Sequence, residues 1–436
     1  MILSTALACA ILVGSFLVLI LIRVPVAFAL GVATIPIVIL DIRLTPFVIL
    51  DRMFQSYNSF ILLAVPFFLL AANLMNSGQI TDRLIALARV MTGWMPGGLG
   101  HVNVAVSMLF AGISGSSTAD AAGCGRILIP AMVKEGYDTR FAVALTACSS
   151  VMGVIIPPSI LMVVWGGVMQ ISVGALFLAG AVPGFLIGFA LMATVYSYAK
   201  IYNYPIVGKP SVSEFFIALK RASLALLTPI LVIGGIVGGL VTPTESAIIA
   251  AAYSLILGVF VYRTVTVKDL GHIFYDTGRF ASISLFAIGT ASAFGWMLSF
   301  YNAPRLIVDF MAAMEFGPFG TAIMIAALFL FFGLFIDAIP TIIILGSVLM
   351  PVAAAAGIHP IIFAIIGIIS LAFGLVTPPY GLCLLISAAI GEISVVKTMR
   401  DVLIILTPML LILLLIIVFP EIALWLPRTL MPDTFN

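Results

Sequence analysis

Charged residues are scarce in this 436-residue chain. Asp, Glu, Lys and Arg together make up 8% of it, whereas 63% of its residues are hydrophobic. A soluble domain carries about 25% charged residues, and the mean hydropathy here is +1.31. One globular core could not shelter so much apolar surface, so the composition predicts a polytopic membrane protein. The formal net charge of +2 gives no reason to expect a nucleic-acid partner.

Residues that build redox, metal and nucleotide sites are also few. The four cysteines lie in apolar segments without C-x-x-C spacing, and the three histidines are scattered. The cysteines therefore indicate small core residues rather than a disulfide framework or a metal site. The chain lacks a G-x-x-x-x-G-K-[ST] phosphate loop, so nothing in it indicates ATP hydrolysis. We predict that it is not an enzyme.

What the chain does contain is a long internal repeat. The stretch Gly112–Ser159 returns without a gap at Gly333–Tyr380, so that adding 221 to a residue number gives its partner. Most of the shared letters are Gly and Pro, which break or bend helices. Apolar segments that are interrupted at corresponding points of two halves are the best indication, from sequence, of a transporter's binding site. The alternative, that Gly and Ser only allow close helix packing, does not explain why the breaks are paired.

The repeat divides the chain into two halves of the same plan, residues 1–199 and 222–426, joined by a polar cytoplasmic link at 200–221. Scaffold spans come first in each half, and a helical hairpin and a broken span follow. The hairpin arms are too short to cross a hydrocarbon core about 30 Å thick at about 1.5 Å per residue. We therefore expect each tip about halfway through the bilayer. The expected ranges are 1–95 before 98–170 in the first half, and 222–316 before 318–391 in the second.

The hairpin tips and the breaks expose helix ends inside the membrane. We expect the first tip at Gly112–Ser117, the first break at Gly153–Pro158 and the second tip at Gly333–Asp337. Helix segments that end there present carbonyl oxygens, and segments that begin there present free N–H groups. Carbonyls and hydroxyls suit a hard cation such as Na⁺, whereas N–H groups suit a carboxylate or a sulfonate.

The distribution of positive charge predicts the orientation. With the amino terminus outside and alternate crossings, fourteen of the 19 Lys and Arg residues fall on the cytoplasmic side and four outside, and Arg126 lies within a hairpin arm. This bias agrees with the positive-inside rule. The first half has five full crossings, an odd number, so the two halves are predicted to be inverted repeats. The sequence thus predicts an all-α, inverted-repeat transporter.

Four charged residues near the breaks can be interpreted in more than one way. Asp120 follows Ser117 by three residues and fits a capping-box acid at a helix start. Glu245 fits a cap as well as a ligand. Arg126 can meet an anion or extend its head group to the membrane surface. Asp337 is harder to explain as a cap, because an acid in an apolar run at bilayer depth is costly and usually functional.

Five motifs show a resemblance to a known family. They are similar to motifs of the large membrane subunit of TRAP (tripartite ATP-independent periplasmic) transporters, and the resemblance covers nearly the whole chain. It implies sodium-driven import of an organic acid across the bacterial inner membrane, with a small four-helix membrane subunit and a periplasmic substrate-binding protein as partners. It also implies an elevator mechanism, in which the hairpins and broken spans slide as one unit against the scaffold. The motifs are GISGSSTADAAG, LIPAMVKEGYD, GVIIPPS, GLVTPTES and GLVTPPYG.

The resemblance further implies site residues. A first sodium ion falls between the first tip and the first break, and a second at the equivalent place in the other half. The sodium candidates are Ser114, Gly153, Ile156 and Pro158 for the first ion, and Gly333, Gly374, Thr377 and Tyr380 for the second. The substrate candidates are Ser116 and Asp337, with Ser117 and Arg126 added for their hydroxyl and their charge.

Two features refine this hypothesis. Ser116 and Asp337 are equivalent under the offset of 221, so inverted symmetry predicts that they reach one cavity from opposite hairpins. Sialic-acid members of the family carry a further substrate serine after the Pro-Pro pair, where this chain has Leu161 and Met162. Dicarboxylates, other sugar acids and sulfonates are therefore open as substrates. The alternative function is a stand-alone sodium/dicarboxylate symporter; a channel is disfavoured, because closed hairpin tips block a continuous pore.

Overall fold

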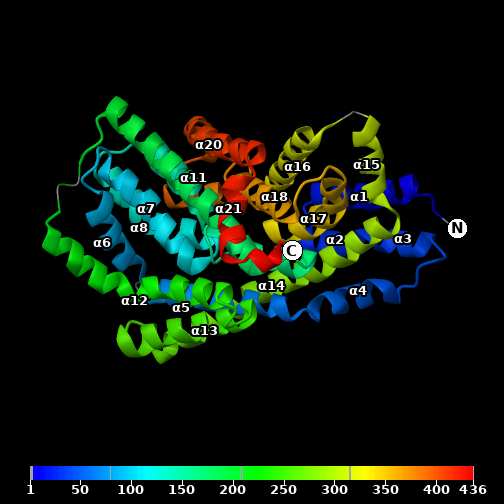
Figure 1. Ribbon diagram of the computed structural model, residues 1–436, viewed down its shortest axis with the longest axis horizontal. Coiled ribbons are helices and arrows are strands. Elements are labelled where there is room, and N and C mark those ends of the chain that lie inside the picture. Colours follow the sequence, from blue (N-terminus) through cyan, green and yellow to red (C-terminus); the bar gives the residue numbers. More distant parts are fainter. Residues whose placement is uncertain (1–2, 79, 207, 209, 314–315, 436) are drawn as a thin grey trace.

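The chain folds entirely into helices in the part that the structure describes. The structure is a computed structural model that describes residues 3–78, 80–206, 208, 210–313 and 316–435, and those residues form no β-strand (Figure 1). Within these ranges, 7 helices are long and apolar enough to cross a membrane, and shorter apolar helices of 10–17 residues accompany them. The protein is therefore a multi-pass membrane protein, as its composition predicts.

The scaffold helices form an elongated layer along one side of the molecule. In Figure 1, α4, α5, α12, α13 and α14 run along the lower edge, and the hairpins lie above them. The first-half members are α1 (Thr5–Leu21), α2 (Val26–Ala33), α3 (Ile35–Leu40), α4 (Phe47–Tyr57), the 3-10 turn η1 (Phe60–Leu63), α5 (Ala64–Ser77) and α6 (Ile80–Thr92). The second-half members are α12 (Val212–Val237), α13 (Pro243–Ile256), the π-helical turn η3 (Leu257–Val261), α14 (Val267–Phe300) and α15 (Ala303–Ala313).

Two hairpins and two broken spans make up the second group of helices. In the first half these are α7 (Gly98–Ser114), α8 (Ser117–Lys134), α9 (Thr139–Ser150) with the 3-10 turn η2 (Val151–Val154), and α10 (Ile160–Met169). In the second half they are α16 (Pro318–Gly333), α17 (Ala338–Ala355), α18 (Pro360–Gly374) and α19 (Leu382–Ile390). Both hairpins and both interruptions are thus present. We call this group of helices the hairpin core.

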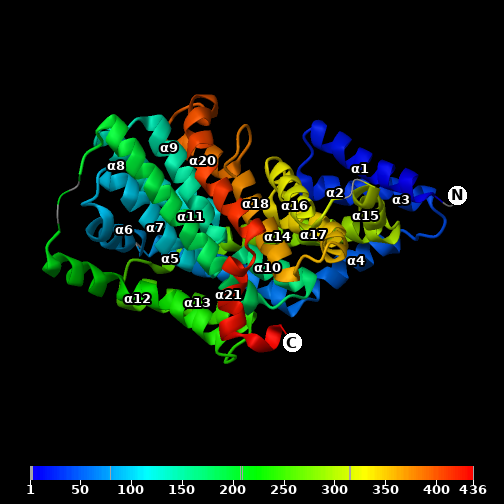
Figure 2. The ribbon, with the colours of Figure 1, turned by 45° about the horizontal axis from the view of Figure 1, so that its top comes forward.

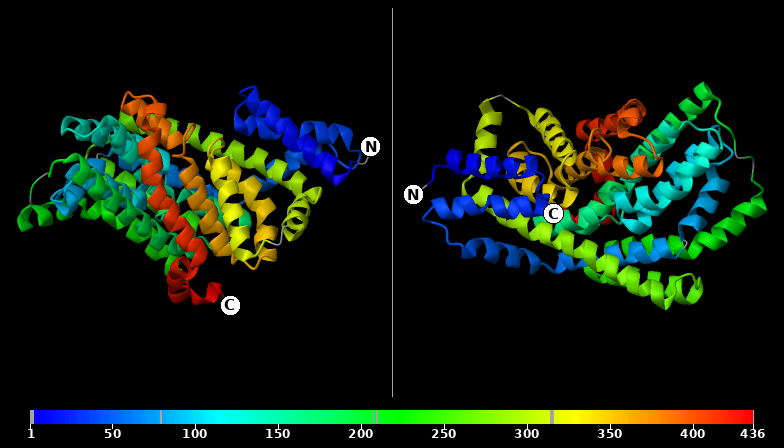
Figure 3. Two further views of the ribbon diagram at one scale, coloured as in Figure 1. Left: turned by 90° about the horizontal axis from the view of Figure 1, so that it is seen from above. Right: turned by 180° about the vertical axis from the view of Figure 1, so that it is seen from behind.

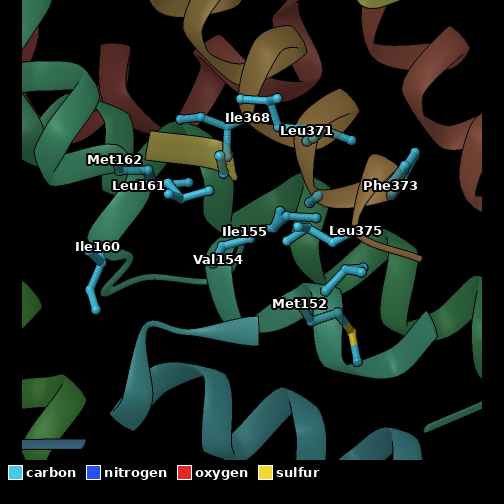
Figure 4. Close-up of a cluster of buried hydrophobic side chains, with 14 of the residues drawn as sticks. Met152, Val154, Ile155, Ile160, Leu161, Met162, Ile368, Leu371, Phe373 and Leu375 are labelled. Carbon is cyan, nitrogen blue, oxygen red and sulfur yellow. The ribbon is translucent and has the colours of Figure 1, made fainter. Parts of the chain in front are cut away.

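The two breaks pack on each other at the centre of the hairpin core. Figure 4 shows apolar side chains from the first break, Met152–Met162, gathered against those of the second, Ile368–Leu375. Segments more than 200 residues apart in the chain are therefore one packed unit, in which side chains interdigitate at close to crystal density.

Helices α11 (Val173–Tyr202), α20 (Val395–Val418) and α21 (Glu421–Leu430) cover the face of the hairpin core that is turned away from the scaffold (Figures 2 and 3). The apolar run Val402–Trp425 predicts one closing span, and this prediction is wrong, because the helix is interrupted at Pro420 between α20 and α21. The polar link is also shorter than predicted, since α11 continues to Tyr202 and α12 begins at Val212. Residues 207 and 209 of the link lie outside the described residues.

Other boundaries differ from the sequence prediction for local reasons. The apolar run Val24–Leu40 predicts one span, but it is divided into α2 and α3 at Thr34, whose hydroxyl donates to the Gly31 carbonyl at 2.6 Å. The apolar run Ser282–Phe300 predicts a span, but α14 begins at Val267, because Thr266 and Asp269 form a capping box that starts the helix about four turns earlier. The charged residues near the start of α14 lower the hydropathy of that part, so the sequence does not indicate a span there, although charged residues suit the aqueous end of a helix.

A buried acid anchors the end of the molecule where α1 and α2 lie. Asp41 is fully buried and accepts hydrogen bonds from the Arg43 guanidinium at 2.6 Å, the Tyr301 hydroxyl at 2.6 Å and the Leu3 N–H at 3.2 Å. The Arg43 guanidinium beside it holds the pKa of the Asp41 carboxyl well below its usual range. This cluster ties the start of α1 to the end of α14, which fixes α1 and α2 against the scaffold.

Candidate functional site

The first hairpin tip is short and rests on the first break. Helix α7 continues to Ser114, so the tip is only Gly115 and Ser116, shorter than the predicted Gly112–Ser117. Gly115 has φ +62°, a conformation that favours glycine. Its carbonyl accepts the Ile160 N–H at 3.2 Å, and a Cβ on Gly115 would lie 2.9 Å from the Pro158 carbonyl oxygen. The tip and the restart of the broken span are therefore in direct backbone contact.

Glycine is also needed where each break meets its own hairpin. A Cβ on Gly153 would lie 2.9 Å from the Ser116 carbonyl carbon and oxygen, and a Cβ on Gly374 would lie 2.6 Å from the Gly333 carbonyl carbon. No side chain fits such gaps without moving the backbone. The predicted sodium residues of each half are thus brought together around these two contacts. In both breaks the bond between the two prolines is cis.

The polar groups at these contacts are mostly oxygens. The Ser114 hydroxyl lies between the tip's own backbone groups, 3.4 Å from the Ser116 N and 3.5 Å from its carbonyl oxygen. The Thr377 hydroxyl donates to the Phe373 carbonyl at 2.7 Å, so its lone pairs stay free for a cation. Ile156 is buried, whereas Tyr380 is 60% exposed. Oxygens with free lone pairs at helix ends suit a hard cation.

Ser116 and Asp337 are the N-caps of the returning hairpin arms. The Ser116 hydroxyl accepts the Ala119 N–H at 3.4 Å at the start of α8, and the Asp337 carboxylate accepts the Ala338 N–H at 2.9 Å at the start of α17. Their equivalence in the repeat is therefore an equivalence of position in the fold. Each stands at the positive end of a helix, where an anion is favoured.

A cavity of about 580 Å³ brings the two caps together. It lies between α5 and α14 of the scaffold and the tips and breaks of the hairpin core. Ser116, Ser117 and Thr118 line it from the first hairpin, and Asp337 lines it from the second. Asp337 is the single charged residue among the described residues of this lining. The cavity size suits a small organic molecule.

Sequence reasoning missed the scaffold side of this cavity. Asn73 and Asn76 of α5 and Ser284 of α14 line it opposite the hairpin tips. The Asn73 amide donates to the Thr277 hydroxyl of α14 at 2.9 Å, which joins the two scaffold helices. The signal was available, since two amides three residues apart lie on one face of an apolar span. That these amides lie opposite the hairpin tips, however, depends on tertiary packing.

A second, larger cavity of about 770 Å³ lies on the other side of the second hairpin tip. Its lining includes Gly333, Tyr380 and Asp337 from the hairpin core. Arg23, in the turn between α1 and α2, lines it from the scaffold.

Three charged residues lie apart from the 580 Å³ cavity. Arg126 is exposed on α8 and lines neither cavity, so the structure does not bring it to the other substrate candidates. Glu245 caps α13, because its carboxylate accepts the Thr242 N–H at 2.8 Å in a capping box. The capping interpretation of Asp120 is wrong: Ser116 is the cap of α8, and both carboxylate oxygens of the buried Asp120 lack a partner among the described residues.

Comparison with known proteins places this arrangement in a family. The model of the family described as "Tripartite ATP-independent periplasmic transporter, DctM component" matches residues 13–422. The chain belongs to this DctM family. It is a transport protein of the membrane and not an enzyme.

Curated relatives of this DctM-family chain cover nearly all of it. It is 39% identical to the sialic acid TRAP transporter large permease protein SiaM of Vibrio cholerae over 378 residues, which are 87% of this chain and 88% of the relative. It is 33% identical to the C4-dicarboxylate TRAP transporter large permease protein DctM of the same species, over 94% of this chain and 95% of the relative. Both relatives thus match along almost their full length.

A solved structure shares the fold. The YdaH transporter of Alcanivorax borkumensis superposes with a TM-score of 0.62 over 87% of this chain and 88% of that one, at 15% identity. At this identity the likeness concerns the arrangement of the helices alone. It extends across both the scaffold and the hairpin core of the DctM-family chain.

Proposed function

We propose that this chain imports a small organic acid across the bacterial inner membrane, coupled to Na⁺ and supplied by a periplasmic substrate-binding protein. One observation carries the proposal: the equivalent caps Ser116 and Asp337 face a single cavity of about 580 Å³ from opposite hairpins. The family and its relatives support it, because the two relatives are named for transport of sialic acid and C4-dicarboxylates.

The two caps have different roles in this proposal. The Ser116 hydroxyl can donate to a substrate carboxylate beside the N–H end of α8. An ionised Asp337 can only accept, and it would repel an acid directly. We therefore assign Asp337 to hydroxyl or amine groups of the substrate, or to offsetting the charge of a nearby Na⁺. Ser117 and Thr118 add hydroxyl groups to the same wall.

Two sodium ions would bind where each hairpin tip meets its break. The first would lie among Ser114, Gly153, Ile156 and Pro158. The second would lie among Gly333, Gly374, Thr377 and Tyr380. Each tip then becomes attached to its break through the ion, because carbonyl and hydroxyl oxygens of both would share it. Ion binding would thereby shape the cavity that receives the acid, which gives a physical basis for coupling.

The lining of the cavity favours acids other than sialic acid. Leu161, at the restart of the first broken span, presents an apolar side chain to the cavity, where sialic-acid members are expected to offer a serine hydroxyl. A buried polar group of the substrate without a partner loses affinity. Dicarboxylates, other sugar acids or sulfonates are the proposed substrate class.

Movement would follow the division into a scaffold and a hairpin core. Both tips and both breaks belong to one packed unit (Figure 4), and the cavity lies where this unit meets α5 and α14. A rigid unit that slides along a fixed scaffold would carry the cavity with it. We propose this elevator movement, with the small four-helix membrane subunit extending the scaffold.

Reconstitution tests the function. The chain and its small membrane subunit are reconstituted into proteoliposomes, and the binding protein is added outside. Uptake of labelled succinate and of labelled isethionate is then measured with Na⁺ or with choline in the external solution. We expect uptake of at least one acid that requires both Na⁺ and the binding protein. Uptake that is equal in choline would exclude sodium coupling, and Na⁺-driven uptake without the binding protein would favour the stand-alone symporter.

The inverted orientation of the halves is tested by labelling. Lys134 and Ala355 are equivalent, exposed and outside left-handed turns, unlike the neighbouring Gly136 and Gly357, whose φ values are +94° and +74°. Single cysteines at Lys134 and Ala355 should react with a membrane-impermeant thiol reagent from opposite sides of the membrane. Reaction of both from the same side would contradict the inverted repeat.

A further inference from the structure

The two cavities of the structure meet at the tip of the second hairpin. The cavities of about 580 Å³ and about 770 Å³ share three lining residues, Asp337, Leu375 and Leu382. These three residues stand between the two cavities, so a ligand that moves from one cavity to the other passes them. The larger cavity thus adjoins the proposed substrate site.

Arg23 is the one cationic residue among the described residues that line either cavity. It sits in the turn between α1 and α2 with φ +66°, and its N–H is bonded to the Ile20 carbonyl at 2.8 Å. Its side chain is exposed, and it takes part in none of the ion pairs found among the described residues. A turn with this backbone holds a guanidinium, with its fork of donors unused, at the wall of the cavity.

The direction in which the cavity leads follows from the charge pattern. Arg23 belongs to the set of Lys and Arg residues that the sequence predicts to be cytoplasmic, and on this prediction the 770 Å³ cavity lies between the proposed substrate site and the cytoplasm. The only charge shared by the two cavities is the negative one of Asp337. An acid that leaves the first cavity would therefore move away from a carboxylate and toward a guanidinium.

We propose that Arg23, together with Tyr380 of the same cavity lining, forms a cytoplasmic exit site for the carboxylate or sulfonate group of the transported acid. The assignment rests on the proposed function of the chain as an importer of organic acids. A guanidinium binds such groups with two parallel hydrogen bonds, and the Tyr380 hydroxyl can donate a further one. Arg23 lies between α1 and α2 of the scaffold and would stay in place while the hairpin core moves, whereas Tyr380 belongs to the hairpin core and would move with it.

The effect is expected on the internal face alone. Arg23→Gln should raise the internal acid concentration needed for half-maximal exchange by about tenfold, since a hydrogen bond to a charged group is lost. Arg23→Lys should retain part of the affinity, because it keeps the charge but not the fork. External half-saturation for the acid and for Na⁺ should not change. An unchanged internal value in both Arg23→Gln and Arg23→Glu overturns the proposal.

The control is a second arginine in the same type of turn. Arg263 precedes α14, has φ +54°, is exposed, belongs to the same cytoplasmic set and lines neither cavity. Arg263→Gln removes the same charge from the same face of the membrane. An equal rise in the internal half-saturation value in this variant would make the effect one of surface charge and overturn the assignment.

A labelling experiment detects acid binding at position 23 without a measurement of transport. Arg23→Cys is made in the complete membrane complex with Cys9 replaced by alanine, since the other cysteines are buried, and the rate of reaction with a cationic thiol reagent is measured. Succinate or isethionate should slow modification when the reagent has access to the cytoplasmic face. No slowing by either acid overturns the exit site. Slowing in a complex that fails to import would contradict the proposed function and leave the anion site standing.

A lipid phosphate is the competing source of the same chemistry. The labelling is repeated in vesicles of phosphatidylcholine alone and in vesicles that contain phosphatidylglycerol. We expect protection by the acid in both. Protection by phosphatidylglycerol without added acid, and none by the acid in phosphatidylcholine, would assign the guanidinium to a lipid headgroup and overturn the proposal.

Discussion

The two hairpin tips occupy equivalent places in the repeat but differ in surroundings. Ser114 and Ser117 of the first tip are each 1% exposed, and backbone contacts hold this tip against its own break. In the second tip, Phe335 stands at the position equivalent to Ser114 and is 49% exposed. The second tip also separates two cavities, whereas the first lines only one.

This difference assigns different tasks to the two hairpins. The first tip, which backbone contacts hold against its break and which faces only one cavity, gives a fixed wall for the site. The second tip borders two cavities, with the Phe335 and Tyr380 rings 5.9 Å apart beside it, and a more exposed segment opens at a lower free energy. The second hairpin is thus the better candidate for a gate, although both hairpins descend from the same sequence pattern.

Asp337→Asn is expected to have the largest effect on function. Asn caps a helix as well as Asp and keeps the shape, so yield and thermal unfolding should stay as in the unaltered chain. Uptake should fall about 10- to 100-fold, because bonds that involve a charged group contribute roughly 1.5–3 kcal/mol. Ser116→Ala at the equivalent cap removes one hydroxyl donor to the substrate carboxylate, and a loss of about tenfold is expected, because the N–H groups at the start of α8 remain to bind the carboxylate. Normal uptake by Asp337→Asn would make Asp337 a cap only.

Gly374→Ala and Gly153→Ala test the contacts between tips and breaks. Overpacking of this kind costs about 1–3 kcal/mol, and Gly374→Ala should be the more severe, because its Cβ would lie 2.6 Å from backbone rather than 2.9 Å. Thermal unfolding of the purified chain measures the loss. Gly278→Ala in α14 is the control, since its Cβ meets nothing within 4 Å, and a small gain in stability is expected there.

Thr377→Val and Ser114→Ala compare the two proposed sodium sites. Each change removes one hydroxyl oxygen, so the Na⁺ concentration for half-maximal uptake should rise about two- to tenfold. Thr407→Val on an exposed face of α20, where the hydroxyl bonds only to the Leu403 carbonyl, should leave it unchanged. If Thr377→Val shifts the sodium dependence and Ser114→Ala does not, only the second half binds a coupling ion.

Replacement of Asp120 by Asn should have the smallest effect on stability, and the reason lies in the hydrogen bonds of its neighbour Ser107. The Ser107 hydroxyl is a polar neighbour of Asp120, but it donates to Ser149 at 3.1 Å, and Ser149 donates to Asn103 at 2.8 Å. Ser107 therefore has only lone pairs left for position 120. An amide at position 120 can donate to them, so Asp120→Asn should change the unfolding free energy by less than about 1 kcal/mol.

The stability of Asp120→Asn is compared with that of two further variants, Asp120→Ala and Thr341→Val. Asp120→Ala removes the buried carboxyl group and leaves a gap in the packing, which should cost about 0.5–3 kcal/mol. Thr341, the equivalent residue of the second half, donates to the Asp337 carbonyl at 2.9 Å, so Thr341→Val should cost about 1 kcal/mol. Chemical unfolding in detergent measures all three. A loss on Asp120→Asn as large as that on Asp120→Ala would show that the carboxylate itself is required.

The sequence alone determined the membrane class, both hairpins, both breaks and the equivalence of Ser116 with Asp337. These follow from local physics: composition selects the solvent, and Gly and Pro interrupt helices wherever they occur. Helix lengths were less predictable. Capping by Thr266 and Asp269 extended α14, and the left-handed Gly115 shortened the first tip, because single hydrogen bonds at helix ends shift a boundary by whole turns.

Only the tertiary structure decided which residues share the cavities. Asn73, Ser284 and Arg23 lie far from the repeat in the chain, and no pattern within the repeat refers to them. The burial of Asp120 and the exposure of Arg126 likewise depend on which face of α8 meets its neighbours. The physical reason is that a repeat specifies the contacts within each half, whereas the walls between the halves form only when the hairpin core packs against the scaffold.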